Sequence, residues 1–292
     1  MKCFYHNDID GKCAGALVAR FTNNYNKEDF IECDYKNPFP IDGVDEGEEV
    51  YFVDLSFSGD NISVLETLFN KKNCRIIWCD HHRTSLDTIA EHPEYEKIEG
   101  IRREGICGAA LTWMYFNGCE FSDCPDFIQL ISDFDCWQMT KDETLPFKYG
   151  IECHDYGALS LLWNRLVRDS ATTHKGLLNE LIDKGKIVDK YVKREYKQYL
   201  SESGYESEFE GYKCFVVNRR ANSLIFGDLI NQYPIMALWV YDGKVYSYSI
   251  YSNGKVDCSK LAELHGGGGH PGASGFTSEQ LLLKSTNKGE TS

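Results

Sequence analysis

Four groups of acidic and histidine residues are spaced along the first half of the chain. They are His6–Gly11, Val53–Ser56, Cys79–His82 and Ser132–Asp135. Carboxylates gathered without cations raise one another's pKa values, which makes such a cluster unfavourable. Divalent metal ions remove this cost, and a mixed oxygen and nitrogen ligand set suits Mn²⁺ or a similar first-row ion. Two such ions would clamp a phosphate and activate a water for in-line attack.

Each group alone also has an ordinary explanation. The Asp-x-Asp-Gly pattern of Asp8–Gly11 is typical of a turn, and Asp54 after a strand could cap a helix. Paired histidines are more often surface or packing residues than metal ligands. Four groups at four predicted element ends nevertheless favour one shared site.

The segments between these groups predict the elements that position them. Runs rich in β-branched and aromatic residues predict strands, and amphipathic runs predict helices between them. The predicted strands are Cys3–His6, Phe30–Asp34, Val50–Asp54 and Arg75–Cys79, and the predicted helices are Ala14–Phe21, Ile62–Phe69 and much of 107–137. This alternation predicts an α/β fold with a parallel sheet. Ligands collect at the carboxyl ends of such strands, where the acidic groups stand.

The second half predicts a long helix and a smaller α/β domain. Apolar residues recur at helical spacing from Leu177 to Val192 among lysines, as in an amphipathic helix with a solvated face. Strands are then predicted at Lys213–Val217, Ile235–Tyr241 and Val245–Ile250, with a helix at Leu224–Ile230. We therefore predict a catalytic domain with a mainly parallel sheet flanked by helices over 1–170, a linker helix over 171–204, a second domain over 205–280 and a flexible tail over 281–292.

A glycine run in the second half suggests a separate binding element. Gly266–Gly269 is followed by His270. Consecutive glycines let backbone N–H groups approach an anion in a concave nest. The alternative is a flexible linker. The run lies between a helix-like segment, Lys260–Leu264, and an ordered-looking one, Pro271–Phe276, which favours the anion site.

Composition excludes several classes of protein. The chain has 31 Lys and Arg against 45 Asp and Glu, a net charge of −14, and the first 150 residues hold 28 of the acids but 14 of the bases. Proteins that hold long duplex nucleic acid usually carry a basic face instead. No apolar run approaches a membrane span. The 12 cysteines form no C-x-x-C pair, which favours reduced thiols and a cytoplasmic location.

Taken in order, these motifs resemble the DHH phosphoesterase family. The resemblance rests on His6-x-Asp8-x-Asp10-Gly11, Asp54, Asp80-His81-His82 and the later Gly-Gly-Gly-His element. It spans roughly residues 3–276 and is nearest to the oligoribonuclease (nano-RNase-like) branch, with RecJ exonucleases more distant. The C-terminal element is similar to the first type of DHH-associated domain.

The resemblance implies a role for each matching residue. His6 and Asp8 would bind one Mn²⁺ ion, Asp10, His81 and Asp133 a second, and Asp54 would bridge them; Mg²⁺ or Co²⁺ could substitute. His82 would face the scissile phosphate. Asp80 would hydrogen-bond to a metal ligand and orient it without binding the metal itself. The loop containing Gly267, Gly268, Gly269 and His270 would hold the substrate's terminal nucleotide or phosphate across a cleft between the domains.

The match to the family is ambiguous at two places in the chain. The fourth acidic group offers both Asp133 and Asp135, and we prefer Asp133 because it directly follows the predicted helix. Many relatives carry an arginine where this chain has Tyr251, which could stack on a base instead. Arg219 and Arg220 are candidate replacements, although surface solvation explains them equally well, and Arg83 is a further candidate phosphate contact.

The sequence thus predicts a Mn²⁺-dependent phosphodiesterase that hydrolyses short single-stranded oligonucleotides to mononucleotides. Short substrates fit the acidic charge because they need no extended basic track. The alternatives are a phosphohydrolase of cyclic or linear dinucleotides or of a 3′-phosphonucleotide, and a non-catalytic nucleotide-binding regulator. Cleavage polarity, the choice between RNA and DNA, and the choice between a monomer and a homodimer stay open. We expect no long duplex and no membrane as partners.

Overall fold

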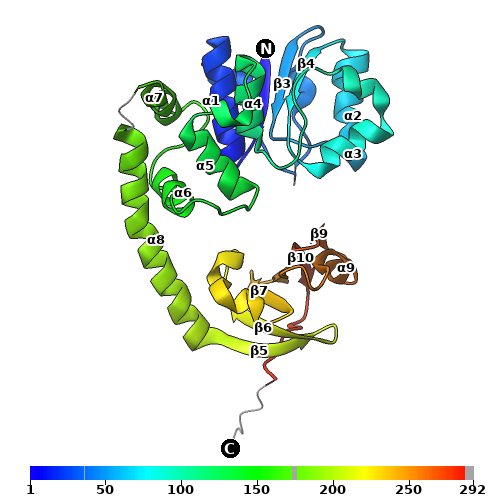
Figure 1. The fold of residues 1–292 in the computed structure, drawn as a ribbon. Helices are drawn as coiled ribbons and strands as arrows, with labels where there is room; N and C mark the ends of the chain where they lie inside the picture. Colours follow the sequence, from blue (N-terminus) through cyan, green and yellow to red (C-terminus); the bar gives the residue numbers. More distant parts are fainter. Residues whose placement is uncertain (36, 173–175, 287–292) are drawn as a thin grey trace, which may run out of the picture. The chain divides into compact units, whose positions relative to one another are not determined.

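The computed structural model describes residues 1–35, 37–172 and 176–286. These form two compact units, Met1–Asp189 and Lys190–Ser292 (Figure 1). The division falls inside the helix that the sequence predicts as a linker. No helix in the described part of the chain is long and apolar enough to cross a membrane.

The first unit is built on a parallel four-stranded sheet, as predicted. Its strands are β1 (Lys2–His6), β2 (Phe30–Cys33), β3 (Glu49–Val53) and β4 (Arg75–Cys79). They lie in the order β2-β1-β3-β4, and every pairing is parallel. Each strand lies within a residue of its predicted bounds. All four carboxyl ends therefore meet at one edge of the sheet.

Helices cover both faces of this sheet. Alternate strand residues point to opposite faces, so Tyr5 and Val53 pack in one core and Phe4 and Phe52 in the other. The first core is covered by five helices: α1 (Ile9–Thr22), α4 (Gly108–Asn117), α5 (Asp126–Asp135), α6 (Thr144–Glu152) and α7 (Leu161–Ser170). The second core is covered by three: α2 (Ile62–Leu65), the π-type helix η4 (Glu66–Lys71) and α3 (Arg83–Glu91) (Figure 1). The helical stretch predicted over 107–137 divides at Gly118, where φ is +60°.

Short 3-10 turns join these elements: η1 (Lys27–Asp29), η2 (Ile41–Gly43), η3 (Gly59–Asn61), η5 (Pro93–Lys97) and η6 (Phe121–Asp123). The predicted linker helix is α8 (Gly176–Ser203), whose first turns bury Leu177, Leu181 and Ile182 in the first unit's core. Of the predicted linker, 173–175 lie outside the described residues.

The second unit contains a six-stranded mixed sheet. Its strands are β5 (Gly204–Phe209), β6 (Tyr212–Asn218), β7 (Ile235–Tyr241), β8 (Tyr246–Tyr251), β9 (Gly268–His270) and β10 (Ala273–Ser278), in the order β5-β6-β7-β8-β10-β9. Only β6 and β7 pair in parallel. The helix α9 (Cys258–Glu263) and the 3-10 segment η7 (Ser223–Asn231) complete the unit. The sequence predicts β6, β7 and β8 but not the other three strands.

The predicted flexible tail is wrong for residues 281–286. Leu283 is fully buried in the core of the second unit. The Tyr205 hydroxyl donates to the Leu283 carbonyl at 2.7 Å, and the Ser207 hydroxyl donates to the Lys284 carbonyl at 2.7 Å. The buried Leu283, with Leu282 packed beside it, and these two hydrogen bonds fix the segment beside β5. The rest of the predicted tail, 287–292, lies outside the described residues.

Candidate metal centre

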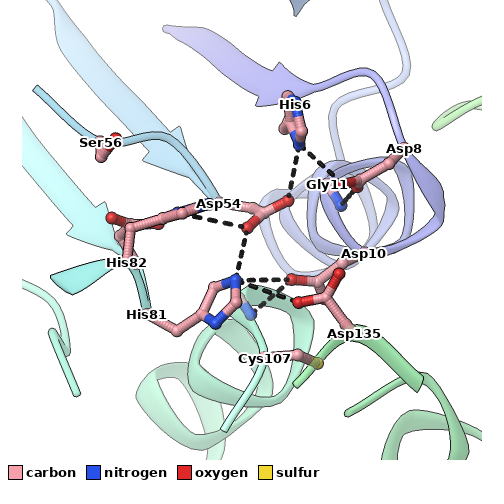
Figure 2. A network of polar contacts seen from close by, with 12 residues as sticks. His6, Asp8, Asp10, Gly11, Asp54, Ser56, His81, His82, Cys107 and Asp135 are labelled. Atoms are coloured by element: carbon pink, nitrogen blue, oxygen red, sulfur yellow. Dashed lines mark hydrogen bonds and ion pairs between the residues drawn. The ribbon is translucent and has the colours of Figure 1, made fainter. Parts of the chain in front are cut away.

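The acidic and histidine groups meet at the carboxyl edge of the parallel sheet. His6 ends β1, Asp54 directly follows β3, and His81 lies two residues beyond β4. Asp10 lies in the first turn of α1, and Asp135 ends α5. Figure 2 shows their side chains converging from four separate segments of the chain.

Asp54 occupies the middle of this cluster. Its Oδ2 lies 3.4 Å from His6 Nδ1, and its Oδ1 lies 3.2 Å from His81 Nε2 (Figure 2). The side chain is 1% exposed, and neither oxygen accepts a hydrogen bond of good geometry from the described residues. Buried carboxylate oxygens normally have partners. Two unsatisfied oxygens that face two different histidines are suited to bridge two cations.

The first half of the cluster is formed by His6 and Asp8. His6 Nδ1 lies 2.8 Å from Asp8 Oδ2. The other Asp8 oxygen accepts a hydrogen bond from the Gly11 N–H at 2.9 Å, which caps α1. One oxygen of Asp8 is thus fixed by the helix start while the other faces the histidine. His6, Asp8 and Asp54 offer ligand atoms that all lie within 4.8 Å of one another.

The second half is formed by Asp10, His81 and Asp135. His81 Nε2 lies 3.1 Å from Asp135 Oδ2 and 3.9 Å from Asp10 Oδ2. Asp10 is held by the start of α4, where the N–H groups of Gly108 and Ala109 donate to its two oxygens at 2.6 and 2.8 Å. A helix N-terminus stabilises a carboxylate in this way.

Gly108 permits this close approach, although it belongs to none of the four acidic and histidine groups of the sequence. A Cβ at this position would lie 2.7 Å from the Asp54 Cβ and 3.0 Å from an Asp10 oxygen. Any side chain would therefore push α4 away from two carboxylates of the cluster. A glycine at the start of a predicted helix is the one signal that could have pointed to it.

The pKa values of the cluster are shifted because its carboxylates are buried close to one another and to histidines. Burial, with the charge of Asp8, raises the pKa of Asp54 to about 7, and burial and the charge of Asp54 raise the pKa of Asp10. Burial lowers the pKa of His6, but pairing with Asp54 and Asp8 outweighs it and raises that pKa to about 10. For His81 as well, pairing with Asp135 and Asp54 outweighs burial and raises the pKa. Crowded carboxylates held by protonated histidines are a donor set that fits divalent cations.

Asp135, and not the preferred Asp133, faces this cluster. Asp133 is buried and points the other way, where it accepts hydrogen bonds from Thr140 N–H at 2.9 Å, from Lys141 N–H at 3.2 Å and from the Thr140 and Thr144 hydroxyls. The two positions are about 200° apart around a helix, since each residue turns the chain by about 100°. Asp133 therefore anchors the turn that leads to α6. Asp135 lies in the position beside His81 that the sequence predicts for Asp133.

This assignment separates the two aspartates experimentally. We expect Asp135→Asn to weaken Mn²⁺ binding at least tenfold with little loss of stability. We expect Asp133→Asn to retain metal affinity but to lower the free energy of unfolding by about 2 kcal/mol, because several donors lose a charged acceptor. Calorimetric metal titration and denaturant unfolding of both variants measure the two effects. The reverse pattern would restore Asp133 as the ligand.

His82 is held by Asp80 at the rim of the cluster. Asp80 is fully buried, and its Oδ1 lies 2.8 Å from His82 Nδ1 while its Oδ2 accepts from the Ser85 hydroxyl. The ring is 29% exposed, and its Nε2 has no partner among the described residues. Asp80 thus fixes the orientation and tautomer of a histidine that can reach a ligand.

Arg83 lies outside this arrangement. Its guanidinium pairs with Asp87 at 2.9 Å and with Glu104 at 3.1 Å on the exposed side of α3. The role of Arg83 as a phosphate contact stays a prediction, which these two ion pairs disfavour.

Tyr35 and Cys136 join the site without having been predicted. Tyr35 lies two residues beyond β2, and its ring centroid lies 5.5 Å from that of His6. Cys136 Sγ lies 4.0 Å from His81 Nδ1, the ring nitrogen opposite the carboxylates. The position of Tyr35 after a strand, like that of Asp54, was a usable signal. No sequence pattern indicated Cys136.

In the second unit, the predicted glycine nest is part of a strand. Gly268 lies in the exposed edge strand β9, which pairs with β10. A Cβ on Gly267 would lie 2.2 Å from the Gly275 carbonyl oxygen, and one on Gly269 would lie 2.7 Å from the Ala273 carbonyl oxygen. These two glycines are needed for backbone packing. Gly268 has no atom within 4 Å of an added Cβ.

A flat strip crosses the sheet beside Gly268. Register pairs Leu238 with Ser249, Ser249 with Gly275 and Gly275 with Gly268. Paired residues share a face of the sheet, so three adjacent strands present only a hydroxymethyl group and two glycines there. We call Ser249, Gly275 and Gly268 the bare strip.

Predicted binding residues border the bare strip. Tyr251 and His270 both pair with Ala273 in the neighbouring row on the same face. On the β7 side, a hollow of about 120 Å³ is lined by Arg219, Arg220 and Ser249, among other residues. Arg219 is half-buried and stacks 3.5 Å above the Tyr199 ring, whereas Arg220 is exposed. The structure thus brings these predicted residues of the second unit onto one face.

Comparisons with known proteins fit both units. Residues 216–288 match the model of the DHHA1 domain. An uncharacterized protein, R106, of Acanthamoeba polyphaga mimivirus is 29% identical over 225 residues, which are 73% of this chain and 50% of that protein. The chain therefore spans about half the length of this curated relative.

Two solved structures share the fold over nearly the whole chain. The pGpG-specific phosphodiesterase PggH of Vibrio cholerae superposes with a TM-score of 0.56 at 13% identity, covering 96% of this chain and 94% of that one. The DHH domain of a member of the s1p family of ribosomal proteins gives a TM-score of 0.52 at 13% identity, covering 94% and 81%. At this identity the likeness concerns the fold.

Proposed function

We propose that this chain, which carries a DHHA1 domain and has the fold of the DHH phosphoesterases, is a metal-dependent phosphodiesterase. Its substrates would be short single-stranded oligonucleotides, which it would hydrolyse to mononucleotides, with Mn²⁺ as the metal. The observation that carries this proposal is Asp54, whose two buried and unsatisfied oxygens face a histidine on either side.

The residues divide into two ligand sets around Asp54. His6 and Asp8 would complete one set, and Asp10, His81 and Asp135 the other. Bound ions would supply Lewis-acid activation of water and charge for the phosphate. His82 stands next to this position with its Nδ1 fixed by Asp80, so its Nε2 can donate to a phosphate oxygen or protonate the leaving group.

Short substrates follow from the charge of the chain. The chain has 45 acidic and 31 basic residues, a net charge of −14, and this charge favours substrates that need no extended basic track. The bare strip provides a flat surface on which a nucleobase could lie, with Tyr251 at its border for stacking. Arg220 and His270 beside the strip are both exposed, and their side chains suit a terminal phosphate.

Two neighbouring glycines test this surface. We expect Gly268→Val to leave the melting temperature unchanged, because nothing lies near an added Cβ, and to raise KM at least tenfold by covering the strip. We expect Gly267→Ala to destabilise the second unit, because its Cβ would lie 2.2 Å from the Gly275 carbonyl oxygen. Thermal melts and steady-state kinetics measure both effects. An unchanged KM in a folded Gly268→Val protein would remove the strip from the substrate site.

One assay distinguishes the proposed activity from its alternatives. The Mn²⁺-loaded protein is incubated with an end-labelled dinucleotide such as pGpG, a five-residue RNA, its DNA counterpart and a cyclic dinucleotide. Mononucleotides released stepwise from the linear substrates are expected. Cleavage of the cyclic compound alone would replace the proposal with the cyclic-dinucleotide alternative, and tight binding without turnover would indicate a regulator.

A further inference from the structure

The side chain of Tyr35 stands over the metal centre without a role in the ligand sets. Its ring centroid lies 5.5 Å from that of His6 and 6.4 Å from that of His82, with an edge-on contact to the latter. The side chain is 44% exposed, so one side of the ring packs on the site while the other meets solvent. Tyr35 therefore borders the space between one ligand set and the histidine that faces the phosphate.

The hydroxyl of Tyr35 is held in a fixed position by Ser56. Its oxygen accepts a hydrogen bond from the Ser56 N–H at 2.9 Å and from the Ser56 hydroxyl at 3.2 Å. Ser56 is fixed in turn, because it lies between the fully buried side chains of Leu55 and Phe57. A phenol oxygen with two donors has used its acceptor capacity.

Apart from the Ser56 hydroxyl oxygen, 3.2 Å away, no acceptor among the described residues takes the hydroxyl hydrogen of Tyr35. Tyrosine keeps its proton at neutral pH, since its ordinary pKa is about 10. The cluster beside it consists of carboxylates and of histidines that pair with them. A ligand with anionic oxygens would be a stronger acceptor than the neutral Ser56 hydroxyl.

We propose that the Tyr35 hydroxyl donates a hydrogen bond to a phosphate oxygen of the substrate, on the side of the metal centre occupied by His6 and His82. The inference rests on the proposed function for its substrate class. A fixed donor aimed at a phosphate stabilises the charge that develops during transfer. Tyr35 is then a catalytic residue that contacts the substrate and binds no metal.

A purely structural role for Tyr35 makes a different prediction. Asp54 has a left-handed backbone with φ of +58°, and Ser56 follows it closely. If Tyr35 only held this segment, loss of its hydroxyl would displace Asp54 and weaken metal binding. Metal affinity and phosphate affinity therefore separate the two roles.

The test uses the full chain loaded with Mn²⁺ and the variant Tyr35→Phe, which keeps the ring. We expect kcat/KM for a linear dinucleotide to fall about 10- to 100-fold, mainly in kcat, as for other charged hydrogen bonds of this kind. Inorganic phosphate, titrated by calorimetry, should bind at least fivefold more weakly, and Mn²⁺ affinity should stay within twofold. Tyr25→Phe is the matched control, because Tyr25 is 46% exposed and its hydroxyl makes one long hydrogen bond within the described part of the chain, to Asn164 at 3.4 Å.

The outcomes distinguish this inference from the proposed function. Normal phosphate affinity in Tyr35→Phe, or wild-type protein that binds no phosphate, would overturn the inference. A fall in Mn²⁺ affinity with unchanged phosphate affinity would also overturn it and leave the structural role. If wild type cleaves no nucleotide but Tyr35→Phe still weakens phosphate binding, the proposed function fails and the inference stands.

Discussion

Replacing Asp54 by asparagine is expected to lower phosphodiester turnover at least about 10³-fold, equivalent to about 4 kcal/mol of transition-state stabilisation. The reason is its central position, with one oxygen 3.4 Å from His6 Nδ1 and the other 3.2 Å from His81 Nε2. An amide offers one oxygen and no charge, so it cannot serve both ligand sets. Turnover of a dinucleotide at saturating Mn²⁺ measures the loss.

The same variant should be more stable than wild type when metal is absent. Burial and Asp8 raise the pKa of Asp54 to about 7, above the ordinary value of about 3.9 that the unfolded chain has. Between about pH 4 and pH 7 the unfolded chain loses this proton while the folded chain keeps it, so the carboxyl group lowers the free energy of unfolding across that range. The effect is absent below about pH 4 and reaches its full size above about pH 7. We expect Asp54→Asn to gain about 3–4 kcal/mol in metal-free protein at pH 8 and about 1–2 kcal/mol at pH 5.

Two measurements check this pair of opposite effects. Urea unfolding in the presence of EDTA at pH 5 and pH 8 reports the stability of the metal-free protein. Asp87→Asn on the exposed side of α3 is a suitable charge-matched control, since Asp87 contacts only Arg83 among the described residues. A metal-free Asp54→Asn protein that is less stable than wild type at pH 8 would show that Asp54 is structural.

Binding of Mn²⁺ should release protons and stabilise the first unit strongly. Pairing with carboxylates raises the pKa of His6 to about 10 and also raises that of His81. Both imidazoles are therefore protonated at pH 7 in the metal-free protein, and a metal ion requires them neutral. Apparent Mn²⁺ affinity should accordingly increase from pH 6 to pH 8, and proton release should exceed one per protein.

The stabilisation has an expected size. Mn²⁺ at 100 times its dissociation constant adds about 2.7 kcal/mol per site, which raises the melting temperature by roughly 5–11 °C for a unit of this size. Calorimetric titrations in two buffers of different ionisation enthalpy count the protons, and thermal scans with and without EDTA give the shift. Metal affinity that does not change between pH 6 and pH 8 would contradict the protonated histidines.

The sequence by itself located the parallel sheet and most of the candidate site. Short, continuous apolar runs fix β1 to β4, because each strand buries both of its faces. The ends of parallel strands share one edge, so His6, Asp54 and His81 had to lie near one another. The pattern of apolar residues was sufficient to predict these strands and the residues at their ends.

Tertiary structure decided the features that depend on distant partners. Asp133 and Asp135 are both acidic and both near the end of a helix, and only the hydroxyls of Thr140 and Thr144 show which of them turns away. Gly268 became part of a strand because β10 pairs with it. Local sequence encodes the conformation of a segment, whereas the direction of a side chain at a helix end and the pairing of an edge strand are set by contacts that arrive from elsewhere in the chain.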